Sequence, residues 1–184
     1  MNIKKTSLEG LLVIEPNQFK DERGFFRETY QKRRYFDLGI SDDFVQDNHS
    51  HSKKGVLRGL HFQIKHPQAQ LLTVMEGRIF DVCVDLRIKS STFGNWCGVY
   101  LSSEDQAQVY MPPGFAHGFY VLSDTADLHY KVSCAFDAQD EGGLLWQDSD
   151  IGIDWPINGK ATISSRDLSY PALKEIPKDR LPHI

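Results

Sequence analysis

The segment 78–86 alternates between large apolar side chains and other residues, and this pattern limits the folds open to the chain. Phe80, Val82, Val84 and Leu86 are separated by Asp81, Cys83 and Asp85. Because successive side chains of a β-strand point to opposite faces, the pattern predicts a strand with one apolar face. Glu76-Gly77 just before it is a turn signal, so we expect a hairpin with the apolar run 71–75.

Similar short runs, each bounded by turn residues, recur at 11–14, 96–101, 108–111, 118–122 and 126–134. Helix-forming residues are confined to 31–38, which Gly39 would end, and to a short segment at 165–170. Many short strands with few helices are typical of an all-β sandwich or barrel. The length of 184 residues fits one domain, 1–184, and the chain has no internal repeat or linker.

Composition excludes several classes of function. A formal net charge of -4 provides no electrostatic footprint for nucleic acid. No apolar run approaches the ~20 residues of a membrane span, and the first residues lead into no signal-peptide core. Cys83, Cys97 and Cys134 are scattered, odd in number and without metal-ligand spacing. We therefore expect a reduced, cytoplasmic protein with no nucleic-acid or membrane partner.

Arg58 and His61 interrupt an otherwise apolar and glycine-containing strand at 55–63. Arginine is a permanent cation suited to phosphate or carboxylate, and histidine exchanges a proton near neutral pH. The alternative is a salt-bridged arginine beside a hydrogen-bonded core histidine. Arg58 and His61 are three residues apart, so in an unbroken strand their side chains would point to opposite faces. A shared site therefore requires a bulge or twist at Gly59, or an Arg58 that reaches a neighbouring subunit's ligand.

Part of a metal-binding pattern of cupin barrels is present. Pro112-x-Gly114-x-x-His117 matches the core of the second cupin motif, although that motif ends at Val121 rather than Asn. His49-x-His51 offers the pair of the first motif, but Gly55 and Val56 stand where its Glu should be. The incomplete ligand set predicts no metal. A metal-dependent cupin isomerase or dioxygenase, using these histidines with His61, remains the alternative.

Further polar residues follow later in the chain. Tyr130 lies in a strand, where a core aromatic with its hydroxyl bonded is the simpler interpretation. Glu141 precedes two glycines, and Arg166-Asp167 could be a solvated helix start. Spacing alone does not show whether these groups converge.

Six ordered motifs between 14 and 167 resemble dTDP-4-dehydrorhamnose 3,5-epimerases. They are Arg23-Gly-Phe-Phe-x-Glu28, Gln46-Asp47-Asn48-x-Ser50, Leu57-Arg58-Gly59-Leu60-His61, Phe80-Asp81-Val82-x-Val84-Asp85-Leu86-Arg87, Pro113-x-Phe115-Ala116-His117-Gly118-Phe119 and Gly152-Ile153-x-Trp155-Pro156. The resemblance implies a metal-free, cofactor-independent, cupin-like β-sandwich or jelly roll with a few short helices. It also implies a homodimer whose substrate is a nucleotide-diphosphate sugar, a 4-keto-6-deoxyhexose.

The resemblance also implies catalytic roles. A proton on a carbon beside a ketone is acidic enough for a positioned base to remove, which gives an enolate, and inversion then needs an acid on the opposite face. The matching histidine, His61, would be the base, and Tyr130 the acid. Asp167 falls at the position of the carboxylate that orients and strengthens this base.

Substrate-binding positions are implied in the same way. Arg23 and Arg58 would bind the diphosphate, because a guanidinium can bind phosphate oxygens in pairs. Phe26 is a candidate for stacking on the nucleobase. The remaining positions expected to contact nucleotide or sugar are Glu28, Gln46, Asp47, Asn48, His117, Glu141 and Arg166.

Two positions depart from the family pattern. Gln70 stands where the family typically has a lysine beside the C4 oxygen, which would stabilise the enolate as a preorganised donor. Ala135-Phe136 replaces a tyrosine pair, and Phe136 keeps the stacking face without the hydroxyl. Three alternatives follow: an enzyme that inverts one carbon only, one that takes another nucleotide or a dideoxy-4-ketohexose, and a non-catalytic binding module.

Overall fold

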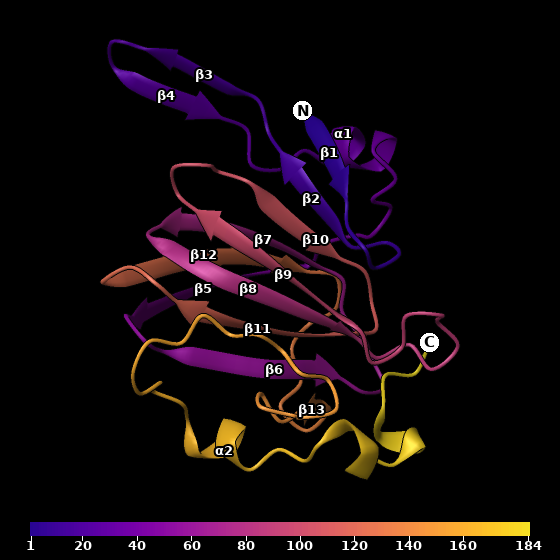
Figure 1. The fold of residues 1–184 in the computed structure, drawn as a ribbon. Helices are drawn as coiled ribbons and strands as arrows, with labels where there is room; N and C mark the ends of the chain where they lie inside the picture. Colours follow the sequence, from indigo (N-terminus) through magenta and orange to yellow (C-terminus); the bar gives the residue numbers. More distant parts are fainter.

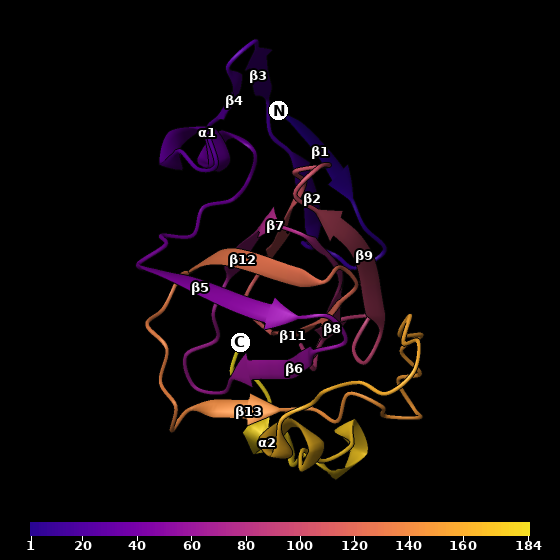
Figure 2. The same cartoon turned by 90° about the vertical axis from the view of Figure 1, so that its left-hand side faces the viewer.

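Two antiparallel β-sheets pack against each other in the computed structural model, which describes residues 1–184 (Figures 1 and 2). Across the first sheet the strands are β1 (Asn2–Lys5), β2 (Leu12–Glu15), β10 (Gln108–Met111), β7 (Gln70–Glu76), β12 (Thr125–Val132) and β5 (Gln46–Lys53). Across the second they are β13 (Glu141–Gly143), β6 (Leu57–Gln63), β11 (Phe115–Val121), β8 (Arg78–Asp85) and β9 (Trp96–Ser102). The predicted β-sandwich is confirmed.

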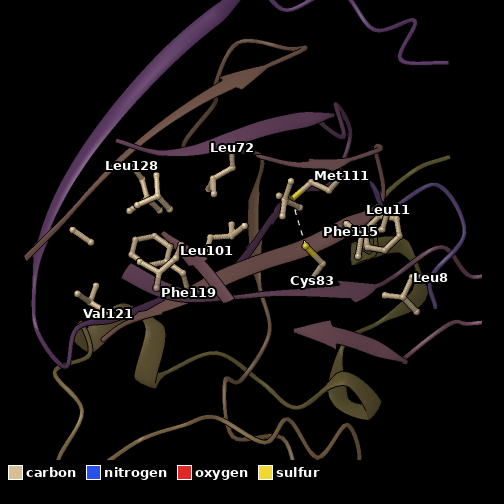
Figure 3. Close-up of a cluster of buried hydrophobic side chains, with 14 residues drawn as sticks. Leu8, Leu11, Leu72, Cys83, Leu101, Met111, Phe115, Phe119, Val121 and Leu128 are labelled. Carbon is tan, nitrogen blue, oxygen red and sulfur yellow. Dashed lines mark hydrogen bonds between the residues drawn. The ribbon is translucent and has the colours of Figure 1, made fainter. Parts of the chain in front are cut away.

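A cluster of 14 buried side chains fills the space between the sheets (Figure 3). Leu72 and Leu128 enter it from the six-stranded sheet, and Leu101, Phe115 and Phe119 from the five-stranded sheet. Burying each such side chain contributes about 1.5–3 kcal/mol, so this cluster holds the two layers together.

Strand β8 differs from the prediction in that both of its faces are buried. It lies between β11 and β9. Its residues Phe80, Val82 and Val84 pack into a second cluster outside the main core, whereas Ile79 and Cys83 on the other face belong to the main core. Asp85 on the other face is fully buried and accepts hydrogen bonds from Arg87 Nε (2.9 Å), Ser90 Oγ (2.6 Å) and Thr92 Oγ1 (2.7 Å). Burial raises the pKa of this carboxyl, but the hydrogen bonds outweigh burial and lower it to about 2.

Several bounds differ from those predicted. β1 and β13 were not predicted, because a short edge strand rich in lysine or glycine has no apolar alternation. β5 remains extended through a wholly polar sequence, and β11 begins at Phe115 rather than at 118. The predicted helices are present as α1 (Lys32–Asp37) and α2 (Ser165–Leu168). Two further single turns are η1 (Leu173–Glu175) and η2 (Lys178–Arg180).

Strands β3 (Gln18–Asp21) and β4 (Gly24–Arg27) form a separate hairpin that projects from one end of the sandwich (Figure 1). Its side chains Phe19, Phe25 and Phe26 are 64%, 59% and 69% exposed. Three large aromatic rings therefore lie in solvent on an element that the rest of this chain does not cover.

No helix of the structure is both long enough and apolar enough to cross a membrane.

Candidate active site

A cavity of about 300 Å³ opens between the two sheets. From the six-stranded sheet and the loop after it, predicted site residues that line the cavity are Gln46, Asn48, Gln70, Tyr130 and Phe136. From the five-stranded sheet and α2 they are Arg58, His61, His117, Glu141 and Arg166. The fold thus brings ten predicted residues to one cavity, from segments that are far apart in the chain.

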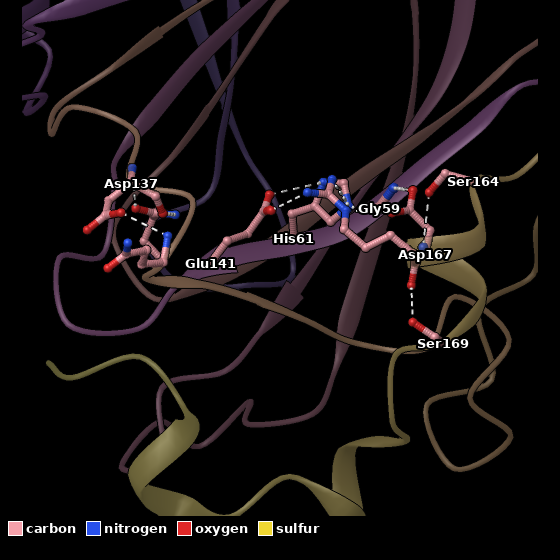
Figure 4. Close-up of polar contacts among 10 residues, drawn as sticks. Gly59, His61, Asp137, Glu141, Ser164, Asp167 and Ser169 are labelled. Atoms are coloured by element: carbon pink, nitrogen blue, oxygen red, sulfur yellow. Dashed lines mark hydrogen bonds and ion pairs between the residues drawn. The ribbon is translucent and has the colours of Figure 1, made fainter.

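His61 is paired with Asp167 beside this cavity (Figure 4). Its Nε2 lies 2.9 Å from Oδ1 of Asp167, and Oδ2 accepts a hydrogen bond from the backbone N–H of Gly59 at 3.2 Å. Burial raises the pKa of Asp167, but these hydrogen bonds outweigh it and lower the pKa to about 2. The ionised carboxylate can only accept, so Nε2 carries the proton and Nδ1 holds a free lone pair.

Nδ1 of His61 lies on the side of Glu141, a residue of the cavity wall. Oε1 of Glu141 is 4.0 Å from Nδ1. Glu141 is paired with Arg166, whose Nη2 lies 3.4 Å from the protonated Nε2. The unprotonated nitrogen, which can take up a proton, thus lies beside Glu141 of the cavity wall.

Asp167 is positioned by the start of α2. Ser164 is the N-cap, and its Oγ accepts a hydrogen bond from the backbone N–H of Asp167 at 3.0 Å. A capping side chain fixes the first turn of a helix, and here it fixes the residue that orients His61.

A bulge at Gly59 lets Arg58 and His61 serve one site. His61 is opposite His117 on β11, whereas Arg58 is opposite Phe119. Two residues of β6, Gly59 and Leu60, therefore lie opposite the single residue Gly118 of β11. A Cβ on Gly59 would lie 2.5 Å from Gly118 Cα, so only glycine allows this approach. The bulge required by the odd spacing is confirmed, and both side chains line the cavity.

A second histidine-carboxylate pair lies next to the first. His117 Nε2 is 2.7 Å from Oδ2 of Asp81, whose side chain is 1% exposed. Asp81 was not among the predicted site residues. The only signal for it was a carboxylate inside an apolar strand, and the sequence did not show that this face of β8 is buried.

Tyr130 lies on β12, in the sheet opposite to that of His61. Burial raises the pKa of its phenol, Arg58 lowers it and Glu141 raises it, with burial the largest effect. The hydroxyl is therefore protonated at neutral pH and can donate. On neighbouring β7, Oε1 of Gln70 is buried at the cavity without a hydrogen-bond partner.

Gln46, Asn48 and Phe136 lie together at another part of the wall. Gln46 donates from Nε2 to Oδ1 of Asn48 at 2.7 Å and accepts at Oε1 from the backbone N–H of Phe136 at 3.1 Å. The Phe136 residue is 50% exposed. This part offers an amide surface beside an accessible aromatic ring.

Besides Asp167, which contacts His61 behind the cavity wall, four predicted residues do not line the cavity of their own chain. Asp47 lies on the opposite face of β5 from Gln46 and Asn48, and its carboxylate accepts from Lys131 Nζ at 2.6 Å. Its predicted contact with a ligand is not supported within one chain, because the period of two turns it away. The others, which belong to the hairpin and the segment after it, are Arg23, Phe26 and Glu28.

The four histidines of the metal alternative do not converge. His49 Nε2 and His51 Nδ1 lie 2.7 and 3.0 Å from the two carboxylate oxygens of Asp127. They lie on the face of β5 that points away from the cavity, whereas His61 and His117 line it. Among residues 1–184, no three His, Cys, Asp or Glu side chains are grouped so that they could hold a metal ion.

Comparisons with known proteins agree with this geometry. A family model described as dTDP-4-dehydrorhamnose 3,5-epimerase matches residues 5–175. The protein of that name from Methanothermobacter thermautotrophicus is 47% identical over 175 residues, which are 94% of this chain and 95% of the relative.

Solved structures are similar over almost the whole chain. A dTDP-6-deoxy-D-glucose-3,5-epimerase from Legionella pneumophila, in complex with dTDP-4-keto-L-rhamnose, superposes with a TM-score of 0.97 at 46% identity, covering 100% of this chain and 98% of that one. A 3'-monoepimerase from Streptomyces bikiniensis, in complex with dTDP-quinovose, has a TM-score of 0.86 at 33% identity, covering 92% and 86%. The predicted cupin-like sandwich is thus shared with enzymes that bind dTDP-sugars.

Proposed function

The chain belongs to the dTDP-4-dehydrorhamnose 3,5-epimerase family, and we propose that it inverts C3 and C5 of a dTDP-linked 4-keto-6-deoxyhexose. The substrate would be dTDP-4-dehydro-6-deoxyglucose and the product dTDP-4-dehydrorhamnose. Each inversion removes the proton next to the C4 ketone, forms an enolate and returns a proton to the other face of the ring. The reaction is an isomerisation, so no net oxidation or group transfer is required.

The observation that carries this proposal is the pairing of His61 with Asp167 on one side of the cavity while Tyr130 stands on the opposite sheet. Nδ1 of His61 takes the proton, and the ionised Asp167 stabilises the imidazolium that forms. The protonated phenol of Tyr130 then donates to the other face of the enolate. Two proton-transfer groups on facing layers are what inversion at carbon requires.

Cations and donors along the wall match the charges of the substrate. Arg58 and Arg166 carry permanent charges that suit the diphosphate. His117, held at Nε2 by buried Asp81, can accept a hydrogen bond from a sugar hydroxyl at Nδ1. Gln70 would face the C4 oxygen with a neutral amide in place of the family's lysine, and a neutral donor stabilises an enolate less than a cation does. Phe136 and the amides of Gln46 and Asn48 would contact the nucleotide.

We infer that the active form is a homodimer. Arg23, Phe26 and Glu28 are expected at the substrate, yet none of them lines the cavity of its own chain, and their hairpin projects from the sandwich on the side away from β6 and α2 (Figure 1). The exposed rings of the hairpin would be buried if a second copy received it beside its own cavity. A symmetric dimer would place one such hairpin at each of two sites.

We further infer that residues 1–184 work as one domain in the cytoplasm. The proposed catalytic groups come from β6, β12 and α2, so segments from the first half of the chain and from its end build the same site. All three cysteines are free thiols, in keeping with a reducing compartment.

Incubation with dTDP-4-dehydro-6-deoxyglucose in D₂O, followed by proton NMR, tests the function. We expect deuterium at both C3 and C5, with formation of the rhamnose configuration. Deuterium at one carbon only would identify a mono-epimerase, like the Streptomyces bikiniensis relative. Tight binding without deuterium would identify a sugar-nucleotide binding module and overturn the proposal.

A further inference from the structure

A third side chain, besides Asp167 and Arg166, approaches His61 from the segment that contains α2. The ring of Tyr170 lies edge-to-face against the imidazole, with centroids 5.7 Å apart and an interplanar angle of 73°. Aromatic pairs prefer edge-to-face arrangements over face-to-face stacking, so this contact favours the observed orientation of the imidazole. The same segment therefore holds His61 by a hydrogen bond at Nε2 and by a packing contact with its ring.

The space for Tyr170 is provided by a glycine on the neighbouring strand. Gly143 on β13 is directly opposite His61 on β6, and residues in such pairs point to the same face. A Cβ on Gly143 would lie 2.2 to 2.3 Å from three ring carbons of Tyr170. The tyrosine ring thus occupies the place that a side chain at 143 would take beside the imidazole.

The backbone around Tyr170 is anchored at the same place. The carbonyl oxygen of Pro171 accepts a hydrogen bond from the backbone N–H of Leu145, two residues beyond Gly143, at 2.9 Å. Three residues earlier, Asp167 makes its own bonds to His61 and Gly59. The chain is therefore anchored on both sides of Tyr170, which does not lie on a free loop.

Tyr170 is not a second proton donor for the substrate. Its side chain is absent from the cavity wall, which His61 lines. Tyr170 therefore makes no direct contact with a substrate in the cavity, and His61 is the lining residue against whose ring it packs.

We propose that Tyr170 is a positioning residue for His61, whose ring, seated over Gly143, keeps the imidazole paired with Asp167 and its Nδ1 directed at the cavity. The role rests on the proposed function, since it concerns the base of that reaction. Removing the ring leaves a gap into which the imidazole can turn about its side-chain bonds. A base that spends part of its time turned away lowers turnover without weakening substrate binding, because it makes no contact that holds the nucleotide.

Tyr170→Ala and Tyr170→Phe separate this role from simple packing. We expect Tyr170→Ala to lower kcat and the rate of deuterium incorporation about 10-fold while KM stays within about twofold. Tyr170→Phe keeps the ring and should retain wild-type kcat. Tyr100→Ala, which removes a 53% exposed ring from β9 away from the cavity, is the matched control and should retain kcat.

Gly143→Ala tests the same contact without touching the tyrosine. Its added methyl must displace the Tyr170 ring, so kcat should fall as in Tyr170→Ala. The double variant should be no worse than Tyr170→Ala alone, because the methyl then has room. Wild-type kcat in both single variants would overturn the positioning role, provided that the wild-type enzyme incorporates deuterium. A wild-type enzyme without deuterium incorporation would instead overturn the proposed function.

Discussion

Nε2 of His61 donates a hydrogen bond to Oδ1 of Asp167 over 2.9 Å, although 106 residues separate the two in the chain. One partner lies in the middle of β6 and the other in the first turn of α2. The contact fixes which imidazole nitrogen is protonated, and therefore which one is free to act as a base. The proposed reaction then depends on the C-terminal segment as much as on the sheets.

Asp167→Asn should lower kcat by about 100-fold while the protein stays folded. The amide can present its NH₂ group to Nε2, which favours the other tautomer and turns the lone pair away from the cavity. Deuterium incorporation and circular dichroism measure the two effects. Asp124→Asn, at a side chain that is 98% exposed, is the control. Equal kcat for both variants would refute the orienting role of Asp167.

His61 and Tyr130 should give different phenotypes. His61→Ala removes the base, so deuterium incorporation should fall below detection. Tyr130→Phe removes only the proton donor, so epimerised product should form slowly while exchange at the substrate carbons continues. Time-resolved proton NMR in D₂O distinguishes exchange from inversion. Equal and mild losses in both variants would contradict these assignments.

Gln70→Lys should raise kcat/KM by about 10-fold. A cation at this position of β7 stabilises the enolate by roughly 1.4 kcal/mol more than the neutral amide does. The lysine also takes the place of an amide oxygen that is buried without a partner. Steady-state kinetics with the dTDP-4-keto sugar measures the change, and Gln70→Met, which offers no donor, should fall below wild type. A decrease with lysine would show that the amide itself is needed.

Asp85 should make stability depend on pH. Its folded-state pKa of about 2 is below the ordinary 3.8, so its ionised form stabilises the fold above about pH 5. That contribution, about 2 kcal/mol, is lost as pH falls from 5 to 2. Asp85→Asn should lower the free energy of unfolding at pH 7 and flatten its decline in acid, as measured with urea. An unchanged acid dependence would contradict this prediction.

Mixing two inactive variants tests the shared site. One carries Arg23→Ala with Phe26→Ser, and the other carries His61→Ala. In mixed dimers one site combines an intact His61 with an intact hairpin from its partner, so exchange of subunits should restore about a quarter of wild-type activity. Mass spectrometry verifies that mixed dimers form. Mixed dimers without activity would show that the hairpin does not serve the neighbouring site.

Many short strands separated by turn residues were enough to predict an all-β sandwich or barrel, because alternation and turns are local properties. The same reasoning predicted that Arg58 and His61 share a site only through a bulge or twist at Gly59, or through an Arg58 that reaches a neighbouring subunit's ligand. Strand β6 contains the bulge. Local patterns were thus sufficient to predict the class of fold and the need for an irregularity in β6.

Properties that depend on distant parts of the chain could not be predicted in this way. Whether the polar face of β8 meets solvent depends on elements packed over it, so Asp81 and Asp85 were not recognised as buried. The family motif around Gln46 predicted that Asp47 contacts the substrate together with Gln46 and Asn48. Because side chains alternate along β5, Asp47 instead lies on the opposite face of the strand. Tyr170 is brought to His61 only by the path of the chain after β13.

Because His61 and Tyr130 lie in different sheets, the proposed proton transfers depend on the distance between the two sheets. Packed sheets lie about 10 Å apart, which leaves room for one sugar ring between two inward side chains. The hydrophobic core between the two sheets therefore sets the distance between the two proton-transfer groups. Trimming it at Val74 or Leu128, which are fully buried, would change the reach of both proton transfers at once. Some core substitutions that still allow the protein to fold should accordingly lower its turnover.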